Sequence, residues 1–511
     1  MDVNMKNKKS NNTIFGIGPE IIDRCVDQGS KGDGELYSLL HSGPMDGRLH
    51  VLHCTTTDSP LIYDQRYGHH WTADQHNRAL MLVENVALAY ENRAYQIGAD
   101  IAAAAEKKEV EKQKSLELRR QTFHKKALSL RKKAGRAACY EFAASNVERS
   151  IAVTLDQFDQ DALKLAGPNG VFYLDIGELE KGKPGDHCLR HTGCKLPEDI
   201  DMPTPPLWKK ALWESLECQE TIDFLQRFLG YCLTGSNQEQ VTVVCDGDGA
   251  NGKGNVSETS LTILGTYASP IQAEMLMDQG RGRAASAPSP DIMSLQGKRL
   301  VIASESDEAR RFSPARLKWL TGGDTLVGRR PHDRFETYFD PTHKLMLYTN
   351  NLPHCPPDDY AFWRRIVRIT WPFRFVKNPQ KENEKKRDDR LLEKLKPEMT
   401  GILAWMIRGC LDWQLYGLQI PQKLKNNTEE YQKDEDTIQD WIDECCITEG
   451  VSDMEYARAT ELYDDFSAWW TKYHSKKVPS MHWFGRRMGR KHKRDKKEGV
   501  KVYRGIQLIS S

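Results

Sequence analysis

The sequence lacks long hydrophobic runs, a strong net charge and a dense cysteine framework. No stretch approaches the roughly 18 uninterrupted apolar residues that span a bilayer, which excludes a membrane-spanning helix. The 12 cysteines are scattered over the chain, and the first dozen residues hold no apolar segment, so we expect reduced thiols and a cytoplasmic location. The net charge is only +1, so the charge of the whole chain gives no indication of a polyanionic partner.

What is present is the composition of a globular chain, with 39% hydrophobic and 28% charged residues. A length of 511 residues exceeds what one hydrophobic core usually supports, so we expect several domains. Short β-rich segments alternate with helical ones from residue 241 to about 376, which predicts an α/β core. The expected division is a disordered start (1–12), an α+β N-terminal domain with a long charged helix (13–205), the core with bracing helices at 206–240 (206–376), a helical connector (377–427) and a C-terminal domain (428–511).

The strongest chemical signal is a glycine-rich loop. The apolar segment VTVVC (residues 241–245) runs into GDGANGK and then into a helical segment. A strand, a glycine loop and a helix N-terminus together present backbone N–H groups to polyphosphate, so we expect ATP as the ligand. Lys253 should reach the β and γ phosphates and face solvent before nucleotide binds. The expected contact residues are Gly247, Asp248, Gly249, Ala250, Asn251, Gly252, Lys253, Gly254 and Asn255.

The loop departs from the usual pattern at one position. G-x-x-x-x-G-K is normally followed by Ser or Thr, whose hydroxyl binds Mg²⁺, but this chain has Gly254 there. Asn255, Ser257 or a water molecule could supply the missing ligand, or hydrolysis could be slow.

Three further segments carry side chains that a nucleotide hydrolase needs. Glu305 ends an apolar segment and is expected to hold Mg²⁺ and orient the attacking water. Asn350 ends another and can sense the γ-phosphate through its amide. Arg364 and Arg365 are adjacent, and a guanidinium projected into a neighbour's site would stabilise the charge of the transition state.

These segments, in this order, resemble the helicase domain of the phage and plasmid primase-helicase family, which is related to poxvirus-type superfamily 3 helicases. The resemblance rests on GDGANGK, GKRLVIASE, LKWLTGGDTLVGRR, FDPTHKLMLYTNNLP and DDYAFWRRI. PNGVFYLDIGEL and FLQRFLGYCLTG resemble the domain before the motor, and GILAWMIRG with EYQKDED resembles the region after it. The resemblance covers about residues 30–510.

The resemblance implies an AAA+-like P-loop motor and assembly into a homohexameric ring that hydrolyses ATP with Mg²⁺ at its subunit interfaces. It implies a replicative DNA helicase of a phage, plasmid or other mobile element, moving 3′ to 5′ on single-stranded and forked DNA in the host cytoplasm. The segment between Thr325 and Tyr338 should form a hairpin in the ring channel. Arg330, His332 and Arg334 would grip phosphates near its tip.

The C-terminal domain carries the densest positive charge. Residues 486–504 hold ten Lys or Arg against two acids, and the domain resembles a winged-helix module. A helix over about residues 481–493 would then enter a DNA groove, with Arg490, Lys491 and Lys493 as contacts. Origin DNA and replication proteins of the host or element are the further partners expected.

Three other interpretations stay open. A primase-helicase would need a polymerising site, and we find no convincing pair of metal-binding carboxylates in a D-x-D arrangement. A DNA-binding ring ATPase without unwinding activity would fit the missing hydroxyl at position 254. A zinc site would use HCLRHTGC (residues 187–194), although its spacing is not that of paired zinc ligands.

Overall fold

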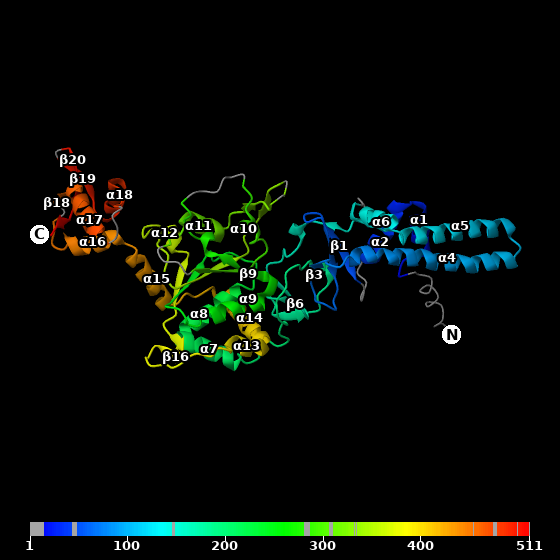
Figure 1. The fold of residues 1–511 in the computed structure, drawn as a ribbon, viewed down its shortest axis with the longest axis horizontal. Helices are drawn as coiled ribbons and strands as arrows, with labels where there is room; N and C mark the ends of the chain where they lie inside the picture. Colours follow the sequence, from blue (N-terminus) through cyan, green and yellow to red (C-terminus); the bar gives the residue numbers. More distant parts are fainter. Residues whose placement is uncertain are drawn as a thin grey trace.

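The computed structural model describes residues 15–42, 49–145, 149–280, 287–305, 310–331, 333, 335–452, 454–473, 478–497 and 499–509. The expected disordered start at residues 1–12 lies outside this description. The protein is a multidomain α/β chain that extends along one axis (Figure 1). None of the helices within the described ranges is both long and apolar enough to cross a bilayer.

A five-stranded parallel sheet forms the centre of the molecule. Its order is β14-β8-β13-β10-β9, and every neighbouring pair is parallel. Four of the five strands match apolar segments of the sequence, because strands buried on both faces need side chains that are apolar on both. The exception is the edge strand β9, which is only partly buried. The strands are β8 (Thr242–Asp246), β9 (Ala268–Gln272), β10 (Leu300–Glu305), β13 (Lys344–Thr349) and β14 (Ile366–Thr370).

The strand order places a crevice at the carboxyl end of β8. From β8 the chain passes through α9 (Lys253–Leu264) to β9 at the far edge of the sheet. The neighbours of β8 are β13 and β14, which are the last two strands of this sheet in sequence. Where the connections from neighbouring strands of a parallel sheet run to opposite sides, a crevice opens at the carboxyl ends of those strands. The glycine loop lies at this point of the sheet.

Three helices brace one face of this sheet: α7 (Pro206–Leu216), α8 (Gln219–Tyr231) and α14 (Met399–Tyr416). They share a hydrophobic cluster with β8 and β14. Glycines let α8 and α14 cross closely, because a Cβ on Gly230 would lie 2.2 Å from the backbone nitrogen of Cys410. The helix α14, expected in a connector, is therefore packed into the core.

The N-terminal region combines a small sheet with a projecting helical arm. The sheet has the order β3-β2-β1-β4 and comprises β1 (His50–Cys54), β2 (Ser59–Tyr63), β3 (Trp71–Ala73) and β4 (Ala152–Val153). It adjoins α1 (Pro19–Asp27), α2 (Ser30–His41) and α6 (Lys133–Ser145). The expected long helix is instead two helices side by side, α4 (Val83–Glu106) and α5 (Val110–Leu130) (Figure 1). Lys108 allows the turn by adopting a φ of 57°.

A second small sheet joins the arm-bearing region to the core. It has the order β5-β6-β7, with β5 (Lys164–Gly167), β6 (Gly170–Tyr173) and β7 (Glu178–Glu180). The Pro168-Asn169 turn between β5 and β6 agrees with the turn signal of the sequence.

The C-terminal region lies at the opposite end of the long axis from the arm (Figure 1). The helix α15 (Gln422–Asp434) leads into α16 (Thr437–Cys445), α17 (Ala459–Tyr473) and α18 (Met481–Lys491). A sheet of β18 (Tyr456–Arg458), β20 (Val500–Arg504) and β19 (Arg494–Lys497) closes the region. Trp441, Phe466 and Phe484 belong to a separate core there.

Candidate nucleotide and DNA sites

The glycine loop needs backbone conformations that only small residues adopt easily. Gly249 and Gly252 both have a φ of 86°, in the left-handed region that suits glycine. A Cβ on Gly252 would also lie 2.6 Å from Ser215 Oγ. The loop is held from outside, because the backbone N–H of Phe375 donates to the carbonyl of Ala250 at 2.6 Å. The shape of the loop is therefore set before any ligand binds.

Lys253 is buried, in contrast to the solvent-facing position expected from the sequence. Lys253 is the first residue of α9, and only 6% of it is exposed. The ammonium donates to the carbonyl of Gly247 at 2.9 Å, to the carbonyl of Thr349, and to Asn350 Oδ1 at 3.3 Å. Burial lowers the pKa of Lys253 below the ordinary lysine value. The structure thus brings together Lys253 and Asn350, which follow the ends of neighbouring strands but lie 97 residues apart in sequence.

A cleft of about 1140 Å³ opens over this loop. It is bounded by α7, by the ends of β10 and β13, and by residues 386–395. Asn251 is 3% exposed, and its amide nitrogen has no hydrogen-bond partner among the described residues. An unpaired buried donor beside a buried ammonium fits an anionic ligand, since buried donors are seldom left unsatisfied. The residues present therefore fit a polyphosphate.

The residues considered for Mg²⁺ lie around the same loop. Gly254 is the second residue of α9, and a Cβ there would meet no atom within 4 Å. Ser257 is buried one turn further along α9. The backbone of Glu305 ends β10 level with Thr349 of β13, but the Glu305 side chain is outside the described part of the chain.

The paired arginines lie at the amino ends of the parallel strands, opposite the edge that carries the glycine loop. The carbonyl of Arg365 accepts from the backbone N–H of Thr242, which begins β8, whereas the glycine loop follows the end of β8. Five strand residues separate the two edges by about 17 Å. Neither guanidinium can therefore reach the glycine loop of its own chain.

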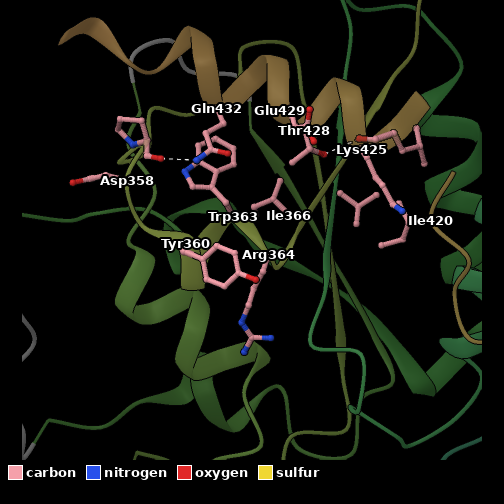
Figure 2. A pocket seen from close by; sticks show the side chains of 13 residues that line it. Asp358, Tyr360, Trp363, Arg364, Ile366, Ile420, Lys425, Thr428, Glu429 and Gln432 are labelled. Carbon is pink, nitrogen blue, oxygen red and sulfur yellow. Dashed lines mark hydrogen bonds between the residues drawn. The ribbon is translucent and has the colours of Figure 1, made fainter. Parts of the chain in front are cut away.

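The two arginines differ in exposure. Arg365 is 8% exposed, and it donates to the carbonyl of Ala361 at 2.5 Å and to Gln240 Oε1 at 3.1 Å. Arg364 is exposed beside a cavity of about 340 Å³ between α12 (Tyr360–Trp363), β14 and α15. Figure 2 shows its guanidinium extending away from α15. Arg364 also donates to Gln240 Oε1, at 3.0 Å, but of the two arginines it is the exposed one, which a neighbouring molecule could contact.

The predicted hairpin is present, although its tip is only partly described. The strands β11 (Leu326–Gly328) and β12 (Thr337–Phe339) pair antiparallel. Arg330 donates to Gln296 Oε1 at 3.0 Å, while His332 and Arg334 lie outside the described residues. Sequence reasoning missed two exposed aromatic residues here, Phe335 at 80% and Tyr338 at 65% exposure. Their position among basic residues was the available signal.

The C-terminal basic residues have different surroundings. Lys493 is exposed, but Lys491 pairs with Asp436 at 2.6 Å. Arg490 forms an ion pair with Asp358, which also lies 3.5 Å from Arg487. In this conformation, then, two of the three expected DNA contacts on or beside α18 are paired with acids of the same chain.

The segment HCLRHTGC makes structural contacts rather than a ligand cluster. Cys188 accepts at its carbonyl from the backbone N–H of Trp71, and His191 exchanges hydrogen bonds with Thr266. Burial raises the pKa of Cys188 and of Cys194 to about 12. Within the described ranges, no three His, Cys, Asp or Glu side chains gather as a metal site.

Comparisons with known proteins bear on the chain as a whole. The D5 N terminal like family matches residues 49–217, which run from β1 to the end of α7. A protein of Acanthamoeba polyphaga mimivirus that is named as a helicase is 27% identical over 342 residues, or 64% of this chain and 35% of that protein. Another so named, from Invertebrate iridescent virus 6, is 23% identical over 63% of this chain and 36% of that protein. These matches support a phage or viral primase-helicase family for this chain.

They agree with the resemblance carried by the motifs. The chain spans about a third of the length of the curated relatives it matches. Among solved structures, an apo structure of the NrS-1 C-terminal region aligns with a TM-score of 0.46 at 12% identity, covering 90% of this chain and 96% of that one.

Proposed function

We propose that this protein is an ATP-driven DNA helicase of the primase-helicase family, with a P-loop motor. The observation that carries the proposal is the contact of Lys253 with Asn350 in a cleft at the carboxyl edge of the parallel sheet. There the glycine loop, the helix N-terminus of α9 and the unpaired amide of Asn251 all present donors to one ligand. ATP is the ligand we assign to this cleft.

Mg²⁺ would neutralise charge on the bound phosphates. Gly254 offers no hydroxyl, so we assign Mg²⁺ to Asn255 and Ser257, which line the cleft, and to Glu305, which ends the neighbouring strand β10. Asn350 would orient the γ-phosphate through its amide. The subunits would form a homohexameric ring on single-stranded and forked DNA, with the hairpin residues Arg330, His332, Arg334, Phe335 and Tyr338 lining its channel.

The C-terminal domain is proposed as a winged-helix-like DNA-binding module. Its exposed basic strands and Lys493 provide a positive surface, and α18 would become available when DNA phosphates displace Asp358 from its arginines. Origin DNA and replication proteins of the host or element are proposed partners on this basis.

Strand displacement from a forked duplex tests the proposal directly. We expect ATP-dependent release of the labelled strand, favoured by a 3′ single-stranded tail. Nucleotide hydrolysis without displacement would favour the ring ATPase that does not unwind. Incorporation of ribonucleotides on a single-stranded template would favour a primase-helicase.

Replacing Gly254 by Ser should lower the Mg²⁺ concentration needed for ATP binding and hydrolysis about tenfold, if one charge-assisted contact of roughly 1.5 kcal/mol is gained. The substitution fits because a Cβ at position 254 meets nothing within 4 Å. The measurement is a Mg²⁺ titration of nucleotide affinity and of turnover.

The matched control is Gly252→Ser. There the new Cβ would lie 2.6 Å from Ser215 Oγ and the φ of 86° is strained for serine, so this variant should lose nucleotide binding. An unchanged Mg²⁺ requirement in Gly254→Ser would mean that Asn255, Ser257 or water already completes the site.

A further inference from the structure

A buried carboxylate lies at the base of the glycine loop. Asp246 is the last residue of β8, is 7% exposed and immediately precedes Gly247. A ligand that carries several negative charges must bind a few residues away. An uncompensated carboxylate at this position would repel it, because charges interact strongly where water is excluded.

Arg368 compensates this carboxylate with two parallel hydrogen bonds. Its Nε donates to Asp246 Oδ1 at 3.1 Å and its Nη2 donates to Oδ2 at 2.9 Å. Thr370, two residues along β14, also donates to Oδ1 at 3.2 Å. The side chains of Arg368 and Asp246 are 13% and 10% exposed, so solvent screens the pair little. The planar fork of arginine fixes the orientation of the carboxylate, which a lysine could not do.

The helix α15 holds Arg368 in place from the other side. Nη1 of Arg368 donates to the carbonyl of Asn427 at 3.3 Å, and the hydroxyl of Thr428 accepts from the backbone N–H of Arg368 at 3.0 Å. The same helix contacts the loop after β13, since Gln432 donates to the carbonyl of Pro357 at 2.6 Å (Figure 2). Arg368 therefore links the base of the glycine loop to the helix that leads into the C-terminal domain.

We propose that Arg368 is a positioning residue for nucleotide binding: it neutralises and orients Asp246, and so makes the glycine loop able to accept polyphosphate. This inference rests on the proposed ATP site. Arg368 touches no ligand itself, because its guanidinium is engaged by Asp246 and α15. Its effect on nucleotide is therefore exerted through the charge and position of Asp246.

The test is a double-mutant cycle read as the affinity of a fluorescent ATP analogue. Arg368→Ala leaves Asp246 charged and should weaken binding about 30-fold, because an unpaired unit charge next to the glycine loop repels the phosphates at an effective dielectric constant of about 20. Asp246→Asn alone should not weaken binding. Adding Asp246→Asn to Arg368→Ala should restore the affinity to within about threefold of the parent protein, because the repelling charge is gone.

A matched control is available in the N-terminal region. Arg93 forms an equivalent two-bond pair with Asp23, at 3.0 and 2.7 Å, far from the glycine loop. Arg93→Ala removes the same type of interaction and should leave nucleotide affinity unchanged. If Arg368→Ala does not fold, Arg368→Lys keeps the charge and should fold with a loss of only a few-fold in affinity.

The outcomes separate this inference from the proposed function. If the parent protein does not bind the ATP analogue, the proposed function fails and the inference with it. If the parent binds and folded Arg368→Ala binds equally well, the positioning role is wrong. If Arg368→Ala binds weakly but Asp246→Asn does not rescue it, Arg368 acts through the fold alone and the inference is overturned.

Discussion

Lys253→Ala should abolish ATP hydrolysis and strand displacement, with a loss of at least about a thousandfold in turnover, as for removal of a group that stabilises the charge of the transition state. Its ammonium is the cation at the glycine loop. Phosphate oxygens would take over the hydrogen bonds that this ammonium now donates to Gly247 and Asn350. The measurement is steady-state ATPase activity with and without DNA.

Burial of Lys253 requires a control for folding. The alanine variant leaves the carbonyls of Gly247 and Thr349 without their ammonium donor, so a modest loss of stability is expected. Lys298→Ala is the matched variant, because Lys298 also donates to two carbonyls, those of Thr266 at 2.9 Å and Ala268 at 3.2 Å, at the opposite edge of the sheet. It should lose comparable stability and keep its ATPase activity. Near-normal turnover in Lys253→Ala would rule out the assigned phosphate-binding role of this lysine.

The local elements of the central α/β core could be predicted from the sequence because each carries its own signal. The apolar segments before Asp246 and Asn350 form strands, and the glycines after β8 form the loop. The burial of Lys253 could not be predicted, since it depends on the carbonyl of Thr349 in β13, 96 residues away. Arg368 gave no signal for the same reason: the register of β14 sets it opposite Val244, and from there its side chain reaches Asp246, 122 residues away in sequence.

The helical arm shows a different limit of the sequence. Residues 86–138 contain no proline, and the helical pattern continues through Lys107, Lys108 and Glu109. The chain nevertheless turns there, with a non-glycine residue at positive φ. The turn lets α4 and α5 share a core, to which each contributes buried residues such as Ile97 and Phe123. Tertiary burial therefore overrides a local preference for one long helix.

Exposure distinguishes the two arginines that the sequence pattern treats alike. Arg365 is buried and bonded to Ala361, so its replacement should mainly reduce stability. Arg364 is exposed at the edge of the sheet opposite the glycine loop, as a residue acting on a neighbour's site must be. The proposed ring therefore predicts a shared site made of Lys253 from one subunit and Arg364 from the next.

Arg364→Ala should lower ATP turnover about a thousandfold, the lower end of what an arginine finger contributes, while ATP affinity and folding stay near those of the parent. The decisive measurement mixes two inactive proteins, Arg364→Ala and Lys253→Ala. A subunit that carries Arg364→Ala keeps its own Lys253, and a neighbour that carries Lys253→Ala keeps its own Arg364, so their shared interface is intact. At a one-to-one ratio about a quarter of the interfaces should be intact, and ATPase activity should reappear.

The mixed assemblies must be shown to form, which co-purification of two differently tagged subunits does. Mixing the parent protein with Arg364→Ala should then lower ATPase activity in proportion to the fraction of interfaces that lose Arg364. The decrease should be steeper if the sites hydrolyse ATP sequentially around the ring. Mixed assemblies that remain as inactive as either component would contradict a shared site. Arg364 would then have to act within its own chain. About 17 Å separates the amino and carboxyl ends of the strands, so this would require a rearrangement of β14.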